Sequence, residues 1–193
     1  MATGKSNFTI LTGDRRTKEV KQLSTWLKHV PTIRRQFERW SDDFDPLSFN
    51  EAASVAVLAN AAAKAGYLAH TEYVAFKRHS TRGRPFRRGR CDLWIANVAD
   101  GYSWAFEVKQ HFAAHGMRQS TIRACLDRAV GDAKEVDQNE GKYRAGCLII
   151  CPMERTFCDS QYIERMDELI SDMSIAFRVG EGRNAAWLAF QIV

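Results

Sequence analysis

The sequence predicts an α/β (α+β) fold in which helices flank a central mixed sheet of four or more strands. Alternating apolar residues on both sides of Asp100-Gly101 indicate a β-hairpin, residues 117–138 carry apolar side chains at helical spacing, and residues 144–153 form a short unbroken apolar run. A strand, a crossover helix and a second strand in this order place two parallel strands in one sheet. The hairpin adds antiparallel neighbours, so the sheet is mixed.

The N-terminal part of the chain is predicted to hold one short strand and two helices. Residues 8–12 are the strand, and residues 18–29 and 32–40 are the helices, with Pro31 between them. The acidic stretch 41–46 is expected to be a solvated connection, because it lacks the central Gly and terminal Glu of an EF-hand calcium loop. Residues 1–47 are therefore expected to be a helical extension packed on a core formed by residues 48–193.

The Ala-rich stretch 48–66 predicts a well-buried helix. Ser48 or Asn50 is suited to the N-cap, and Gly66 is suited to the position just after the helix. A strand over residues 67–76 follows and leads towards the hairpin. The C-terminal part is predicted to form a helix at residues 160–172 and strands at residues 174–179 and 185–193.

Composition and cysteine usage favour an intracellular globular protein. The 193 residues are 45% hydrophobic and 26% charged, which is ordinary for a domain with a proper core. The five cysteines are odd in number and form no CxxC motif, so they are expected to be free thiols in a reducing compartment. No run of about 18 apolar residues and no signal-peptide pattern is present. The sequence predicts a cytoplasmic location and no membrane interaction.

The hairpin at residues 90–110 is predicted to gather three charged side chains on one face. With Asp100 and Gly101 as a two-residue loop, Asp92 lies opposite Lys109 and Trp94 opposite Glu107. The Cβ atoms of Asp92 and Glu107 would then lie ~6 to 7 Å apart, within reach of one cation. A three-residue loop would shift the register and break this convergence. The other face is predicted to be a core surface made of Leu93, Ile95, Trp104, Phe106 and Val108.

The basic excess of the chain is concentrated in residues 77–90. This segment has seven Lys and Arg residues and no acid, whereas the remaining chain has 21 basic residues against 23 acidic ones. Gly83, Pro85 and Gly89 predict an irregular loop that emerges beside Asp92 and Lys109. Arginine clusters attract phosphates, so nucleic-acid contact is expected, although a solvated loop or one that binds an acidic partner protein stays open. The basic residues are Lys77, Arg78, Arg82, Arg84, Arg87, Arg88 and Arg90.

Asp92 and Glu107-Val108-Lys109 resemble the signature of the PD-(D/E)XK, or restriction-endonuclease-like, nuclease superfamily. That signature is an Asp on one strand and Glu/Asp-x-Lys on the next, and the resemblance extends over residues 49–153, where the expected element order is the family's αβββαβ. One departure is Cys91, which stands where the literal motif has Pro. The resemblance implies a restriction-endonuclease-like core and assigns residues 48–193 to a PD-(D/E)XK nuclease-like domain.

The resemblance also implies an activity, which is Mg- or Mn-dependent hydrolysis of phosphodiester bonds, with DNA favoured over RNA and an endonuclease favoured over an exonuclease. Asp92 and Glu107 would bind the metal ion together with the carbonyl of Val108. The first core helix of the family often adds an acidic ligand, and Glu51 is the candidate here, with a structural role at the helix N-terminus as the alternative.

Lys109 and Gln110 complete the expected catalytic set. Lys109 would orient the attacking water and stabilise charge, because an unperturbed lysine with a pKa near 10.4 is not a base at neutral pH. Gln110 extends the motif to Glu-x-Lys-Gln, but alternation turns it to the core face, so a catalytic role requires a bend in the strand.

Two alternatives stay open at this point. Glu107 and Lys109 can be members of a surface ladder, and the chain can be a catalytically silent nuclease-fold module that binds nucleic acid or a protein partner. A homodimer and a partner such as an inhibitor or targeting subunit are both compatible with the sequence. So are restriction-like, defence-system and mobile-element settings.

Overall fold

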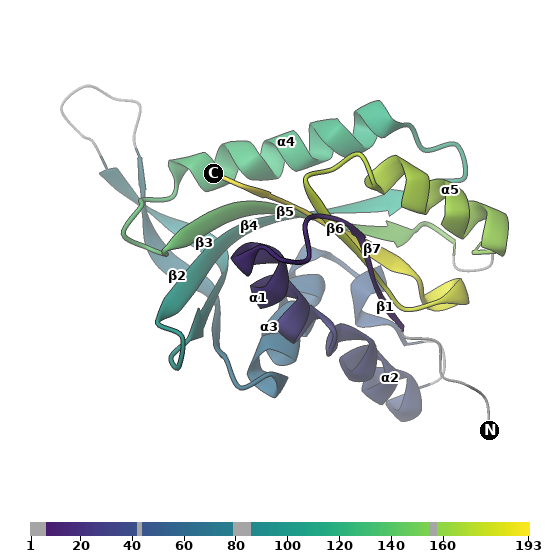
Figure 1. Cartoon of the computed structure of the whole chain (residues 1–193), viewed down its shortest axis with the longest axis horizontal. Helices are drawn as coiled ribbons and strands as arrows, with labels where there is room; N and C mark the ends of the chain where they lie inside the picture. The colour runs from purple at the N-terminus through teal and green to yellow at the C-terminus, as the bar shows by residue number, and fades with distance from the viewer. Residues whose placement is uncertain (1–6, 42–43, 79–85, 155–157) are drawn as a thin grey trace.

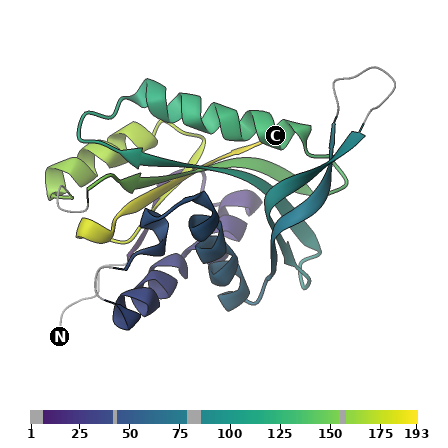
Figure 2. The same ribbon diagram turned by 180° about the vertical axis from the view of Figure 1, so that it is seen from behind.

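A seven-stranded mixed sheet lies between two layers of helices in the computed structural model, which describes residues 7–41, 44–78, 86–154 and 158–193 (Figure 1). One layer holds α1 (Lys18–Leu27), α2 (Val30–Trp40) and α3 (Glu51–Lys64), and the other holds α4 (Gln119–Glu135) and α5 (Ser160–Ile170). The reverse view shows the same two layers (Figure 2). The predicted α/β class, with helices on both faces of a mixed sheet, is confirmed.

The strands follow the order β1-β6-β7-β5-β4-β3-β2 across the sheet. β4 and β5 are parallel and are joined by α4, as the sequence predicts, whereas the other neighbouring strands are antiparallel. The strands are β1 (Phe8–Thr12), β2 (Leu68–Arg78), β3 (Phe86–Asn97), β4 (Tyr102–Ala113), β5 (Tyr143–Pro152), β6 (Ile175–Val179) and β7 (Ala186–Ile192), with short 3₁₀ turns η1 (Pro46–Ser48) and η3 (Gly182–Asn184).

Each face of the sheet has its own hydrophobic core. The core beneath α1–α3 contains the five side chains predicted for the apolar face of the hairpin, among them the fully buried Trp104 and Phe106. The core beneath α4 and α5 contains Leu148 and Trp187. Because the side chains of β5 alternate between the two cores, all of its residues from Ala145 onwards are buried, as expected for a strand covered on both faces.

The N-terminal segment is integrated into this architecture. β1 pairs with β6 at the edge of the sheet, and Val20 and Trp26 of α1 lie in the same core as Phe106. The expectation that residues 41–46 are a solvated connection is wrong for Asp45. That carboxylate is buried and forms a two-pronged ion pair with Arg34, with its Oδ1 3.0 Å from Nε of the guanidinium. A buried carboxylate needs such a partner, since desolvation penalises an isolated charge.

α3 begins and ends where local chemistry directs it. The Asn50 side chain accepts a hydrogen bond from the Ala53 amide at 2.8 Å, so Asn50, not Ser48, is the N-cap. Gly66 follows the helix with a φ of 83°, which glycine adopts without steric cost. This start places Glu51 in the first turn of the helix, directed at β4.

The register of the β3–β4 hairpin differs from the predicted one by two residues. Leu93 pairs with Phe106 and Asn97 with Tyr102, so residues 98–101 form a four-residue loop and not the expected two-residue loop. The Asn97 side chain accepts a hydrogen bond from the Ala99 amide at 3.0 Å, and this contact turns the chain one pair early. Because the shift is even, the paired residues 93–97 and 102–106 keep their predicted faces.

Where the structure describes the basic segment, it is a regular ribbon and not the predicted irregular loop, whereas residues 79–85, with Gly83 and Pro85, lie outside the described residues. β2 continues to Arg78 and β3 begins at Phe86, so the two strands remain paired through Arg78 and Phe86. Of the predicted phosphate-binding residues, Arg82 and Arg84 lie outside the described residues. Gly89 lies inside β3, opposite Ala75, and its Cα faces the aliphatic stem of Lys77. Glycine in a strand commonly marks such a close approach, which explains why it did not break the strand.

Candidate functional site

The candidate site lies at a fork in the sheet, where β3 stops pairing with β4. The paired register ends at Leu93 and Phe106, and one residue further on the Asp92 carboxylate accepts a hydrogen bond from the Val108 amide at 2.7 Å. β3 continues beside β2, whereas β4 continues beside β5. Asp92 thus bridges the two branches with its side chain, and the sequence motif is placed at the point where the sheet opens.

A backbone irregularity directs Asp92 into this fork. Glu72, which lies across from Asp92 between two regular pairs, has a φ of 53°, an uncommon value for a residue other than glycine. Cys91 packs with Ala75 in a small cluster near α4, while Leu93, two residues later, lies in the core beneath α1–α3. Two residues of ordinary strand would share one face, so the ribbon kinks at Asp92.

Glu107 is the most deeply buried carboxylate of the site, with 3% of its surface exposed. Its Oε1 forms an ion pair with Nζ of Lys77 at 2.8 Å. Burial raises the pKa of Glu107 to about 7, which outweighs the opposing effect of Lys77, and the nearby Asp92 charge adds to the increase. The Glu107 carboxyl group is therefore poised between its charged and neutral forms at neutral pH.

Two further carboxylates share this environment. Burial raises the pKa of Asp92, although the Val108 amide and Lys109 oppose the shift. Burial likewise raises the pKa of Glu51, whose Oε2 accepts a hydrogen bond from the Gln110 amide at 3.1 Å. Burial is thus the largest cause of the raised pKa of all three carboxyl groups around the fork, and such a group of perturbed carboxyls marks a candidate functional site.

Lys109 provides positive charge beside them. Its Nζ lies 2.9 Å from Oδ2 of Asp132 on α4. Burial alone would lower the pKa of Lys109, but Asp132 together with Glu51 and Asp92 outweighs it, so the pKa is raised. Lys109 is consequently an ammonium ion at neutral pH.

The structure brings together most of the residues predicted for the site. Glu51, Asp92 and Lys109 lie within electrostatic range of one another, and Glu107 lies beside Asp92. Gln110 makes one contact with its side chain and another with its backbone. Its side chain points to the helical layer, as the alternation predicts, and donates to the Leu47 carbonyl at 2.6 Å, while its backbone amide holds Glu51. Gln110 thus positions Glu51 and does not direct its side chain at the fork.

The donors at the fork are carboxylate oxygens, which suit a hard cation such as Mg²⁺. In the described part of the chain, however, no three or more His, Cys, Asp or Glu side chains form a group arranged to hold a metal ion. Asp92 and Glu107 are each engaged by protein donors, the Val108 amide and Lys77 respectively. The ligand types therefore fit a divalent cation, which would compete with Lys77 for the negative charge of Glu107.

The basic residues of the ribbon fall on two faces. Lys77 and Arg87, a directly opposed pair, face α4, where Arg87 forms an ion pair with Glu135 at 2.9 Å. Arg78, Arg88 and Arg90 lie on the opposite face and are exposed. The predicted positive surface is therefore real for three residues, whereas Lys77 neutralises Glu107.

Two functional contacts were missed from the sequence. The pairing of Lys77 with Glu107 depends on the kink at Asp92, which leaves no local sequence signal. Asp132 continues the row of Cys125 and Ala129 that faces the sheet, and this helical spacing could have indicated its contact with Lys109.

Comparison with protein-family models, curated proteins and solved structures found no match for this chain. All five cysteines are free thiols. Across the described residues, none of the helices combines the length and apolarity needed to cross a lipid bilayer. Any statement about activity must therefore come from the geometry of the fork itself.

Proposed function

We propose that this protein is a metal-dependent nuclease that hydrolyses phosphodiester bonds, most readily of DNA, at the fork between β3 and β4. The observation that carries the proposal is the meeting of Asp92, Glu107 and Lys109 at this fork, with Glu51 added by the first turn of α3. The order α3-β2-β3-β4-α4-β5, with β4 and β5 parallel, supports the resemblance to the restriction-endonuclease-like core.

Asp92 and Glu107 are the proposed metal ligands. Phosphodiesters resist attack because their anionic oxygens repel a nucleophile, and a bound Mg²⁺ supplies both charge stabilisation and a more acidic water. The raised pKa values of Asp92 and Glu107 are consistent with this role, because a divalent cation offsets the carboxylate charge that burial penalises. Glu51 and the Val108 carbonyl are the proposed additional oxygen donors.

Lys109 acts through its charge in this proposal. Since the pKa of Lys109 is raised, its ammonium group is not available to accept a proton from water at neutral pH. It instead stabilises the negative charge that develops on the phosphoryl oxygens and holds the attacking water. The Asp132 carboxylate, 2.9 Å away, positions this ammonium group from the α4 side.

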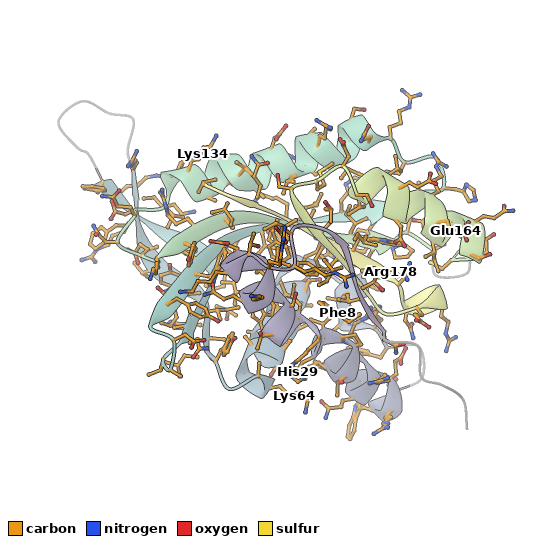
Figure 3. All side chains as sticks on the ribbon, viewed as in Figure 1. Phe8, His29, Lys64, Lys134, Glu164 and Arg178 are labelled. Carbon is orange, nitrogen blue, oxygen red and sulfur yellow. The ribbon has the colours of Figure 1, made fainter. Side chains whose placement is uncertain are left out.

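The test is cleavage of supercoiled, linear and single-stranded DNA, and of RNA, in Mg²⁺ or Mn²⁺. Asp92→Asn and Lys109→Ala are each expected to lower the rate on the order of 100-fold or more, the usual cost of removing one transition-state contact. EDTA is expected to abolish the activity. Lys134→Ala and Glu164→Gln are matched controls, because both side chains are exposed and belong to the outer helices α4 and α5 (Figure 3). Cleavage that survives both site substitutions would refute the assignment.

A second candidate function is a nuclease-fold module that binds nucleic acid without turnover. The Lys77–Glu107 ion pair favours it, since a lysine there neutralises the carboxylate in place of a metal ion. The same assay separates the two functions: salt-dependent binding without cleavage in either metal would support the module.

A further inference from the structure

The far end of the β2–β3 ribbon carries a regular alternation of apolar and arginine side chains on one face. Three successive cross-strand pairs on this face each join one apolar residue to one arginine: Val74 with Arg90, Phe76 with Arg88 and Phe86 with Arg78. Directly opposed residues share a face, and side chains two apart along a strand do so as well. We call these six residues the outer ribbon face.

The outer ribbon face is uncovered by the rest of the described chain. The exposed fractions of Val74, Phe76 and Phe86 are 69%, 55% and 50%, whereas Ala75, on the inner face, is 1% exposed. The ribbon is fixed to the body of the protein along the edge of β2, where Lys77 forms a bridge with Val136 and the Phe76 amide donates to the Glu140 carboxylate, and on its inner face by the ion pair of Arg87 with Glu135. The far end of the ribbon extends past the end of α4 (Figures 1 and 2). Its outer face presents large apolar side chains to solvent.

The arginines of this face indicate which kind of molecule can bind there. Arg78 and Arg88 have no acidic side chain within ion-pair distance in the described part of the chain, and Arg90 is held at 3.5 Å by the exposed Glu72. A suitable occupant has regularly spaced anions for the arginines and flat apolar surfaces for the phenylalanines. Unpaired nucleotides offer both, because every base has a π-face and every linkage a phosphate, whereas bases inside a duplex are already stacked on each other.

We infer that the outer ribbon face is a stacking platform for the bases of single-stranded nucleic acid, with Phe76 and Phe86 under the bases and Arg78 and Arg88 on the phosphates. The inference rests on the proposed function only in naming the substrate class of that site. Along β3, Arg90, Arg88 and Phe86 lie about 7, 13 and 20 Å from Asp92 at the usual rise per residue. The platform therefore holds a single strand a few nucleotides from the fork.

Binding without turnover tests this inference independently of catalysis. Fluorescein-labelled oligothymidylate, oligouridylate and a DNA duplex of equal length are titrated by anisotropy with the full chain carrying Asp92→Asn, in EDTA. Phe76→Ala and Phe86→Ala are each expected to weaken single-strand binding roughly 5- to 150-fold, the range for losing one base–aromatic stack. Phe86→Tyr is expected to retain the affinity because it keeps the ring. Arg88→Ala is expected to reduce the slope of log K against log salt by about 0.7.

Trp40→Ala is the matched control, since Trp40 is an 89% exposed aromatic residue at the end of α2. Its affinity for single strands is expected to stay within about two-fold of the parent, because no stacked base is lost. Preference for oligothymidylate or for oligouridylate supports the inference in either case and assigns DNA or RNA.

Three results would overturn the inference. They are unchanged single-strand binding in both alanine variants, an equal loss of duplex binding, and a dimer in sedimentation that Phe76→Ala converts to monomer. The last result would identify the face as a contact between two copies of the chain. Failure of the nuclease assay alone leaves these binding results unaffected, so the two proposals fail separately.

Discussion

Replacing Glu107 by Gln is expected to change how stability depends on pH. Burial raises the pKa of Glu107 from 4.5 to about 7, so between these pH values the folded protein keeps a proton that the unfolded chain releases. The free energy of unfolding therefore falls as pH rises, by about 1.4 kcal/mol per pH unit and about 3 kcal/mol across the window. This stabilisation is fully present below pH 4.5 and is lost above pH 7.

Urea denaturation in EDTA at pH 5, 6, 7 and 8 measures this slope. Glu107→Gln cannot titrate, so its free energy of unfolding is expected to fall about 3 kcal/mol less than that of the wild type over this range. The absolute stability of the variant is not the readout, because Lys77 also loses its partner at 2.8 Å. Glu164→Gln, an exposed carboxylate, is expected to follow the wild type. Parallel curves for the wild type and Glu107→Gln would refute the account of burial.

The same measurement with Mg²⁺ tests the proposed metal site. A cation binds the ionised carboxylates, so it is expected to stabilise the wild type more at pH 8 than at pH 6. Asp92→Asn is expected to remove this difference. If Mg²⁺ stabilises neither protein at pH 8, the metal assignment fails while the explanation of the raised pKa of Glu107 stands.

Two other substitutions test the packing of the fold. Asp45→Ala leaves the buried guanidinium of Arg34 without its ion-pair partner. The free energy of unfolding measured by urea denaturation is expected to fall by about 3 to 5 kcal/mol. A loss below about 1 kcal/mol would show that the pair is dispensable. Gly146→Ala would place a Cβ 2.5 Å from the backbone nitrogen of Val130 and is expected to cost about 1 to 3 kcal/mol, whereas the neighbouring Gly131→Ala meets nothing within 4 Å and is expected to add about 0.5 to 1 kcal/mol. Equal effects of the two alanines in thermal and urea denaturation would contradict this reading of the α4–β5 contact.

In the β3–β4 hairpin, the alternation of side chains along a strand was enough to predict which residues share a face. Alternation alone assigns Glu107 and Lys109 to one face and Phe106 and Val108 to the other, and this assignment survives the error in loop length because the register shifts by two. The loop length was mispredicted because the Asn97 side chain accepts a hydrogen bond from the Ala99 amide and so starts the turn before Asp100-Gly101.

The ribbon and the kink were beyond sequence reasoning for a different reason. Gly89 is a usual breaker of regular structure, but the effect of such a residue depends on tertiary contacts, and here Lys77 packs over Gly89 inside a paired strand. The positive φ of Glu72 has no sequence signal either, since nothing in glutamate favours it. Such positions persist only where the surrounding structure holds them, which is why they are found by inspecting the fold.

Lys77 lies between the fork and the outer ribbon face. Its stem lies over Gly89 and its ammonium group reaches Glu107, while its neighbours Phe76 and Arg78 project from the outer ribbon face. A single strand bound as proposed would contact Phe76 and Arg78, the residues directly before and after Lys77 in β2. A metal ion bound as proposed would compete with Lys77 for the negative charge of Glu107. Under the two proposals, Lys77 is therefore the residue through which a strand on the ribbon would act on the metal site.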